Sequence, residues 1–371
     1  MIMLKSFSVE NFKGFRDKIT FNLGSPCNYN FNQEVICDGC VTKGILFGVN
    51  SSGKSNLGLA LLDLVCHLTD NQTLPDNYYP YRNLESGKSI AEFEYVFSFR
   101  GKELIYQYGK SDIDKLEYEK LSISGREVIY YDYLRNEGFT RLKGAETLNQ
   151  MIAVKSAISR VKYVSSNAIL AENEENAVFY DFMHYVNHML LFYSLDTRGY
   201  EGFRSGKGSI AEGILESGKL LDFQHFLKEN GIVYELVKAE TNGKKAILCR
   251  YGDEFVDFFA VASTGTRALA LFYYWYIVMH DASLVYIDEF DAFYHFELAN
   301  NIIRRLKEIK GVQVFATSHN TDLMSNDLLR PDCYFLIKGN GIVPMSNATD
   351  KELRRAHNLQ KMYKAGAFDE G

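Results

Sequence analysis

Cysteine is scarce in this sequence, with six residues scattered over 371 positions. That number and spacing exclude a secreted disulfide framework, so we expect free thiols in a reducing cytoplasm. Cys37 and Cys40 form one C-x-x-C pair, but no second pair follows at the spacing of a zinc finger. The pattern favours a structural role for these two cysteines over a zinc or redox site.

Long apolar runs and an excess of positive charge are also absent. The longest apolar run, residues 268–279, is well short of the roughly 20 residues that a membrane span needs. Residues 1–12 alternate instead of forming the apolar centre of a signal peptide, so we expect a cytoplasmic protein with no membrane partner. The net charge of −6 gives no global field that would attract nucleic acid, although it does not exclude a local basic patch.

Hydrophobic residues are plentiful, at 46 %, which is enough for one large domain or two modest ones. Apolar and polar residues alternate in the first third, which predicts a hairpin of residues 4–12 and 18–23. Further alternating runs, separated by glycines, predict an antiparallel meander at 91–100, 103–108, 115–123 and 127–131.

The period then changes to that of a helix over residues 145–228. One predicted helical face contains Phe179, Phe182, Met183, Val186, Met189 and Leu190. Strand patterns return at 232–238, 246–250, 254–259, 284–287 and 312–316, with helices predicted at 267–279 and 297–307.

Strands that alternate with helices indicate an α/β fold. We expect a mixed, mainly parallel sheet with an appended antiparallel β subdomain and a helical insertion. The predicted parts are residues 1–140, the insertion 141–231, and residues 232–371.

Residues 48–55 read G-V-N-S-S-G-K-S and fit the phosphate-loop pattern G-x-x-x-x-G-K-[ST]. A β-rich run precedes them, and leucines at helical spacing follow. Glycines such as Gly48 and Gly53 let backbone N–H groups converge on phosphate oxygens at a helix N-terminus. Lys54 would reach the β- and γ-phosphates, and the Ser55 hydroxyl would bind Mg²⁺. The context therefore favours a site for ATP and Mg²⁺ over an ordinary glycine-rich turn.

Residues 284–289 read L-V-Y-I-D-E, a buried type of strand that ends in two adjacent acids. Ligands bind at the carboxyl ends of strands in open α/β sheets, so this strand would deliver both carboxylates beside the phosphate loop. Asp288 would hold Mg²⁺, and Glu289 would orient or deprotonate the attacking water. A solvated acidic turn is the weaker alternative.

A second strand of this kind, residues 312–316, is followed by T-S-H-N. A lone histidine is usually structural, but His319 stands just past a strand end, on the rim where the γ-phosphate would sit. We therefore predict that it senses phosphate. Residues 262–266 read A-S-T-G-T ahead of a helix, and by themselves Ser263 and Gly265 indicate a helix cap.

Together these motifs resemble the ABC-type ATPase heads of the RecF, SMC and OLD (overcoming-lysogenization-defect) proteins. L-K-S-F-S-V-E-N-F-K-G-F is similar to their first strand, and G-V-N-S-S-G-K-S-N-L to their loop G-x-N-G-S-G-K-S-N. Ser51 replaces a glycine of that loop. The resemblance implies nucleotide binding by the loop residues Asn50, Ser51, Ser52 and Asn56.

The OLD-like branch is the nearest in sequence pattern. I-D-E-F-D, followed by His295, resembles its Walker B and D-loop segment, and T-S-H-N resembles its switch histidine. The C-terminal M-Y-K-A-G-A-F is similar to the end of stand-alone OLD-like ATPases. The likeness covers about residues 3–23, 43–62 and 261–322.

In that family ATP joins two heads, and the signature S-x-G of one head caps the γ-phosphate held by the other. The resemblance implies this role for Ser263 and Gly265 and a D-loop role for Asp291, across a homodimer or a higher homo-oligomer. The leucine and the first glycine of L-S-G-G-Q are missing, and no Q-loop glutamine is identified, Gln107 being a poor match. The implied activity is ATP hydrolysis to ADP and phosphate, with Lys54, Glu289 and His319 as catalytic residues.

Two biological roles follow from the resemblance. The first is a regulatory ATPase of a bacterial anti-phage defence system that controls a separately encoded effector, such as a nuclease. The stretch after His319 is too short for the Toprim domain of OLD nucleases, which favours this role. The second is a RecF-like repair ATPase that clamps DNA, which the acidic charge disfavours. An ABC transporter subunit is a weaker third reading.

Overall fold

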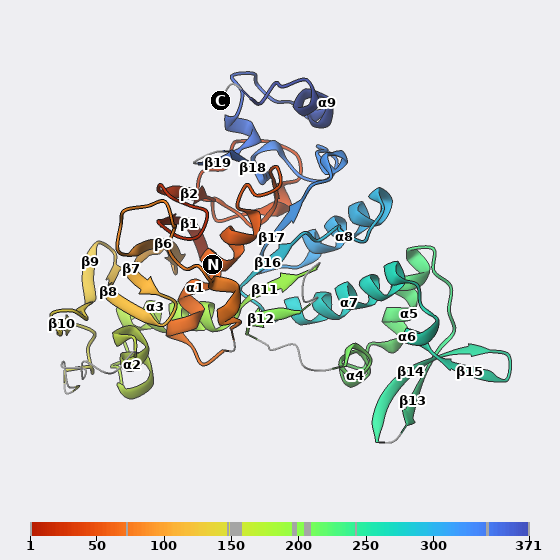
Figure 1. Ribbon diagram of the computed structural model, residues 1–371, viewed down its shortest axis with the longest axis horizontal. Helices are drawn as coiled ribbons and strands as arrows, with labels where there is room; N and C mark the ends of the chain where they lie inside the picture. Colours follow the sequence, from red (N-terminus) through yellow and green to blue (C-terminus); the bar gives the residue numbers. More distant parts are fainter. Residues whose placement is uncertain are drawn as a thin grey trace. The chain divides into compact units, whose positions relative to one another are not determined.

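The computed structural model describes residues 2–71, 73–146, 148, 158–194, 199–203, 209–241, 243–338 and 341–369. The chain divides into two compact units (Figure 1). The first unit consists of Met1–Ser205, Ala282–Phe290 and Lys310–Gly371, and the second of Gly206–Asp281 and Asp291–Ile309. The second unit thus takes in parts of both the predicted insertion and the predicted C-terminal part.

The first unit contains an antiparallel sheet of seven strands in the order β10-β9-β8-β7-β6-β1-β2. The predicted hairpin and meander are confirmed, because these strands pair with their neighbours along the chain. Alternation explains them: in β6 every second residue is buried and the residues between are partly exposed. The bounds are β1 Met3–Glu10, β2 Ile19–Asn22, β6 Ala91–Phe99, β7 Lys102–Asp112, β8 Lys115–Ile123, β9 Arg126–Asp132 and β10 Glu137–Thr140.

The second sheet of this unit has the order β12-β11-β16-β17-β5-β18-β19. Its five inner strands run parallel, and the two edge strands are antiparallel. Inner strands such as β5 and β16 are almost entirely apolar and buried, as expected for a parallel sheet covered on both faces. The predicted α/β fold class is confirmed. The bounds are β5 Lys43–Phe47, β11 Met189–Tyr193, β12 Tyr200–Gly202, β16 Leu284–Asp288, β17 Gln313–Ser318, β18 Tyr334–Lys338 and β19 Gly341–Pro344.

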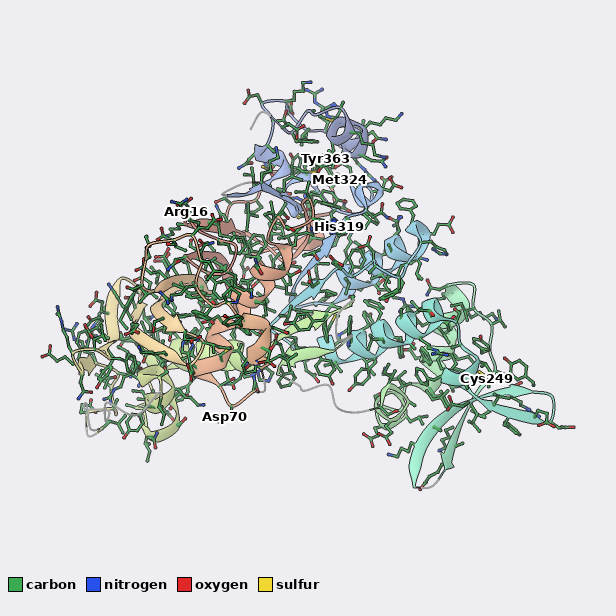
Figure 2. All side chains as sticks on the ribbon, in the orientation of Figure 1. Arg16, Asp70, Cys249, His319, Met324 and Tyr363 are labelled. Carbon is green, nitrogen blue, oxygen red and sulfur yellow. The ribbon has the colours of Figure 1, made fainter. Side chains whose placement is uncertain are left out.

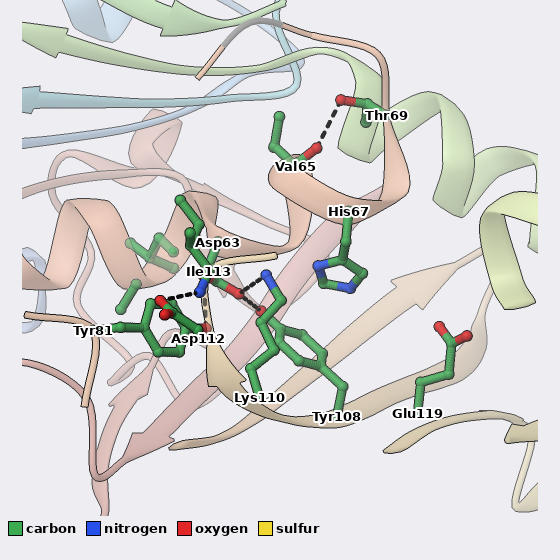
Figure 3. Close-up of polar contacts among 12 residues, drawn as sticks. Asp63, Val65, His67, Thr69, Tyr81, Tyr108, Lys110, Asp112, Ile113 and Glu119 are labelled. Atoms are coloured by element: carbon green, nitrogen blue, oxygen red, sulfur yellow. Dashed lines mark hydrogen bonds and ion pairs between the residues drawn. The ribbon is translucent and has the colours of Figure 1, made fainter. Parts of the chain in front are cut away.

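Helix α1, Lys54–Leu68, follows the phosphate loop and is buried along nearly its whole length. Its Asp63 carboxylate forms an ion pair with Lys110 of β7 at 2.9 Å and accepts hydrogen bonds from Tyr81 and Tyr108 (Figure 3). These contacts fasten α1 to the antiparallel sheet. The other elements of the unit are β3 Ile36–Cys37, β4 Cys40–Val41, α2 Arg160–Asn167, α3 Glu174–Asn187, α9 Leu359–Lys364 and the 3-10 turns Gln33–Val35, Pro75–Tyr78, Thr321–Leu323, Pro331–Cys333 and Met345–Asn347.

One buried amide joins the two sheets of the first unit. Gln313 begins β17, and its side chain both accepts from the Leu4 N–H at 2.7 Å and donates to the Leu4 carbonyl at 3.0 Å. Its amide also donates to the Val41 carbonyl, and its oxygen accepts from the Tyr185 hydroxyl. A buried amide with these partners is satisfied, so it fixes β1 against the parallel sheet.

The second unit combines helices with a small antiparallel sheet of order β13-β14-β15. Aromatic residues form its core: the Tyr273 ring lies 5.0 Å from Phe223 and 5.1 Å from Phe226 between ring centroids. No helix in the described ranges is long and apolar enough to cross a membrane. The elements are α4 Ile210–Glu216, α5 Leu220–Glu229, α6 Phe258–Val261, α7 Thr264–Met279, α8 Phe296–Glu308, β13 Leu236–Thr241, β14 Lys244–Tyr251 and β15 Glu254–Asp257.

The structure corrects two predictions of secondary structure. Met189 and Leu190 do not continue the helical face of α3, because the helix ends at Asn187 and Met189–Tyr193 forms β11. This run of buried apolar residues fills the sheet between β12 and β16, and such a run suits a buried strand as well as a helix. The strand predicted to reach residue 259 ends at Asp257, whose side chain accepts from the Ala260 N–H and caps α6.

Candidate phosphate-binding site

The phosphate loop connects the end of β5 to the start of α1. Its backbone enters the left-handed region at Ser51, with φ +63°, and at Gly53, with φ +101°. A side chain at Gly53 would also come within 2.6 Å of the Phe15 ring, and one at Gly48 would overlap the Ser52 hydroxyl. The glycines therefore allow a tight loop at the N-terminus of a helix, where an anion is favoured.

Lys54 folds back over this loop. Its ammonium donates to the carbonyls of Gly48 at 2.9 Å and Val49 at 3.2 Å, and the residue is 6 % exposed. Burial lowers the pKa of Lys54, while the nearby Glu289 and Asp288 carboxylates act in the opposite direction. The Ser52 hydroxyl is buried and has no hydrogen-bond partner in the described part of the chain. Both groups are suited to phosphate oxygens.

The Asp288 carboxylate ends β16, which lies between β11 and β17. The hydroxyls of Ser55 and Thr317 hydrogen-bond to it. Burial raises the pKa of Asp288, and these two hydrogen bonds oppose the shift. A partly buried carboxylate next to a serine hydroxyl presents the oxygen atoms that Mg²⁺ prefers.

Glu289 follows in an unusual backbone conformation, with φ +50°. Its N–H donates to the Thr317 hydroxyl at 2.7 Å. The His319 Nε2 lies 3.5 Å from the Glu289 Oε1, and Figure 2 labels His319 on the segment just beyond β17. A carboxylate and an imidazole thus lie side by side where two parallel strands end.

Two adjoining cavities bring these residues together. The first, of about 450 Å³, is lined by Glu289, His319 and the loop and helix residues Asn50, Ser51, Ser52, Gly53, Lys54, Ser55 and Asn56. The second, of about 390 Å³, shares Ser55, Asn56 and Glu289 with the first. It is also lined by Lys13, Leu59, Asn77, Tyr193, Ser194 and Asp288. The predicted phosphate-loop, metal and histidine residues therefore surround one continuous region.

Several residues of this region were missed by the sequence reasoning. Ser194 follows β11, and its buried hydroxyl has no hydrogen-bond partner among the residues that the structure describes. The signal was present, since M-L-L-F-Y-S is an apolar run that ends in a polar residue, as residues 284–289 are. Lys13 donates to the carbonyls of Asn77 at 2.9 Å and Tyr79 at 3.2 Å, and burial lowers its pKa. Thr317 lies two positions before the predicted His319.

Ser263, Gly265 and Asp291 belong to the second unit. The Ser263 hydroxyl accepts from the Thr266 N–H at 3.2 Å and caps α7, so the predicted cap is present. The space around Gly265 is open, the nearest atoms to an added side chain being the Phe293 carbonyl at 3.8 Å and the Ser263 hydroxyl at 4.0 Å. Gln107 does not line either cavity, and its amide donates to Glu94 at 2.6 Å.

Comparison with known proteins finds one family model. The family described as "AAA domain, putative AbiEii toxin, Type IV TA system" matches residues 166–325. This segment contains Ser263, Asp288, Glu289 and His319, whereas the phosphate loop precedes it. The search of the curated proteins found no match.

Among solved structures, 151 chains match. One is the SMC head domain from Thermotoga maritima, with 16 % identity, a TM-score of 0.47, and coverage of 92 % of this chain and 98 % of that chain. Another is the SmcHead bound to the C-winged helix domain of ScpA, with 12 % identity, a TM-score of 0.47, and coverage of 90 % and 94 %. The ATP binding subunit of an ABC transporter matches with 10 % identity, a TM-score of 0.39, and coverage of 97 % and 98 %.

Proposed function

We propose that this protein binds and hydrolyses ATP with the help of Mg²⁺. One observation carries the proposal: a glycine-rich loop at a helix N-terminus, with the buried Lys54 folded across it, shares a cavity with Glu289 and His319. The Ser52 hydroxyl of that loop, which has no hydrogen-bond partner among the described residues, is a further group suited to a phosphate oxygen.

The chain's own residues then have distinct tasks. Lys54 exchanges its two carbonyl partners for the β- and γ-phosphate oxygens. Ser55 and Asp288 would hold the metal, which would supply positive charge against the phosphates. Glu289 accepts a proton from the attacking water, and His319, 3.5 Å away, orients that carboxylate and contacts the γ-phosphate.

The same proposal includes head-to-head dimerisation on ATP. The N-terminus of α7 is exposed at Ser263 and Thr264, and the space over Gly265 is open. A helix N-terminus of this kind favours an anion, so it suits the γ-phosphate held by a second copy of the chain. Asp291 would act in the same interface. Because ATP contacts both copies only when they are joined, it shifts the equilibrium towards the dimer.

The biological role we propose is that of a cytoplasmic regulatory ATPase in bacterial anti-phage defence, acting on a separately encoded effector. Support comes from the OLD-like motifs and from the similarity of residues 166–325 to a family described with a toxin of a Type IV TA system. The competing role is that of an ATPase that clamps DNA.

The first experiment is the solution mass of Glu289→Gln with and without Mg-ATP. We expect hydrolysis to fall by about 10²- to 10⁴-fold, because the general base is lost, and the variant to form a dimer only with ATP. Lys54→Ala is the matched control and should neither bind ATP nor dimerise. Normal ATP affinity in Lys54→Ala would overturn the ATP site, and a monomeric Glu289→Gln with ATP bound would overturn the trans contact.

The second experiment separates the two biological roles. Glu289→Gln with ATP is used to capture material from the native cell. A second protein that is retained only with ATP supports the regulatory role. Retention of DNA alone, in the same ATP-dependent way, would replace it with the DNA clamp.

A further inference from the structure

Thr317 is a buried residue that contacts three consecutive residues of the carboxylate turn. Its hydroxyl donates to the Asp288 Oδ1 at 2.9 Å and accepts from the Glu289 N–H at 2.7 Å. Its carbonyl accepts from the Phe290 N–H at 3.1 Å. The side chain is fully buried and lies in β17, the strand next to β16. A single hydroxyl therefore links the side chain of one carboxylate residue to the backbone of the next.

The backbone of Glu289 needs such a support. Its φ of +50° lies in the left-handed region, which is unfavourable for a residue with a side chain because the Cβ atom approaches the following carbonyl oxygen. Strained residues of this kind persist only where their surroundings hold them. The Thr317 hydroxyl holds the N–H of Glu289 itself, so it fixes the direction in which the Glu289 side chain leaves the turn.

Thr317 is also connected to the histidine. His319 is two residues further along the chain, and its Nε2 lies 3.5 Å from the Glu289 Oε1. The end of β17 thus sets the position of the imidazole directly and the position of the carboxylate through the Thr317 hydroxyl. The two groups keep one relative geometry because both depend on the same strand.

We infer that Thr317 is a positioning residue, whose hydroxyl aligns the Asp288 and Glu289 carboxylates for hydrolysis without contacting the nucleotide. This inference rests on the proposed function, since it assigns the residue a part in ATP turnover. It predicts that removal of the hydroxyl slows the chemical step and leaves nucleotide binding intact, because the groups of the phosphate loop are untouched. If Thr317 only stabilised the fold, its removal would not slow the chemical step while leaving nucleotide binding intact.

The test compares Thr317→Val, which keeps the shape and removes the hydroxyl, with Thr317→Ser, which keeps the hydroxyl. The measurements are kcat for ATP, the Kd of a non-hydrolysable ATP analogue, and the melting temperature. We expect kcat of Thr317→Val to fall about 10- to 100-fold, as expected for a slight misplacement of a reacting group, with Kd changed less than about threefold. Thr317→Ser should keep kcat within about threefold of the wild type. Thr317→Ala replaces the valine variant if that variant does not fold.

Thr42→Val is the matched control. Thr42 is also buried, but its hydroxyl donates to the Val35 carbonyl at 2.8 Å and does not line either cavity. This control should lose stability without losing kcat. Unchanged kcat in Thr317→Val, or a loss of kcat in Thr317→Ser equal to that in Thr317→Val, would overturn the positioning role of Thr317 but not the proposed function. Absence of any Lys54-dependent ATP hydrolysis in the wild type would overturn the proposed function and this inference with it.

Discussion

Replacement of Lys110 by methionine should destabilise the first unit by about 3 kcal/mol. Lys110 and Asp63 are both fully buried, and their charged groups lie 2.9 Å apart in an ion pair. Loss of one partner of a buried pair leaves an uncompensated charge, which costs about 3–5 kcal/mol. The hydroxyls of Tyr81 and Tyr108 still donate to the Asp63 carboxylate, so we expect the lower end of that range (Figure 3).

The assay is urea unfolding of Lys110→Met, Asp63→Asn and the double variant. Because the pair interacts directly, the double variant should lose less stability than the two single variants together, with a coupling of at least about 1 kcal/mol. Lys88→Met is the control, since Lys88 pairs with Glu10 at 2.7 Å but its side chain is 51 % exposed, and it should change stability by less than about 0.5 kcal/mol. If Lys110→Met lowers the free energy of unfolding no more than Lys88→Met does, or if the effects of Lys110→Met and Asp63→Asn add in the double variant, the buried ion pair does not stabilise the packing of α1 on the antiparallel sheet.

Two further predictions concern Lys43 and Ser194. Burial lowers the pKa of Lys43 from its usual 10.5 to about 8, so between these pH values the unfolded chain binds more protons than the folded chain, and the free energy of unfolding should rise with pH by up to about 3 kcal/mol. Urea unfolding at pH 7.5 and 9.5 should detect a rise in the wild type that Lys43→Met lacks. An equal rise in both proteins would refute the lowered pKa of Lys43. Ser194→Ala removes a hydroxyl that has no hydrogen-bond partner in the described part of the chain, so the free energy of unfolding should change by less than about 0.5 kcal/mol. Because Ser194 lines the same cavity as Asp288, the affinity for Mn²⁺ in the nucleotide complex should fall about tenfold. A titration monitored by the Mn²⁺ paramagnetic signal measures this affinity, and unchanged Mn²⁺ binding would contradict it.

The contiguous parts of the candidate site are those that the sequence can predict. The predicted phosphate loop would bind an anion with the backbone of one short segment, so its glycines, Lys54 and Ser55 appear together in the sequence. Asp288 and His319 were predicted for a related reason, because each stands at the end of a buried apolar strand and such strand ends meet at one edge of a parallel sheet. The structure accordingly places Ser55 and Asp288 in one cavity and Glu289 and His319 in the other.

The sequence could not distinguish strands from helices where the apolar run was continuous. The first residues of β11 were taken for the end of a helical face, and β18 was missed because no strand was predicted after residue 316. Both lie just inside the edge strands of the parallel sheet, and nearly all of their residues are buried, which removes the alternation that identifies a half-buried strand. The two sheets were expected, but the contact that joins them was not, since the amide of Gln313 bonds to residues more than 270 positions away.

The residues that orient the site were missed because parallel strands are necessarily distant in sequence. A crossover between parallel strands takes a dozen or more residues, so a group that steadies Asp288 from β17 or lies beside it on β11 cannot share its motif. Thr317 is 28 and 29 positions from the residues it bonds, and Tyr193, which precedes Ser194, is paired in register with Asp288 across β11 and β16. Where a sequence contains a phosphate-loop pattern, the polar residue that ends each buried apolar run is therefore a candidate for the nucleotide site, whether or not it belongs to a motif. That rule would have selected Ser194 and Thr317 here. The proposed phosphate contacts lie within one segment and can be predicted from the sequence, whereas the proposed alignment of the carboxylates depends on the neighbouring strands of the sheet.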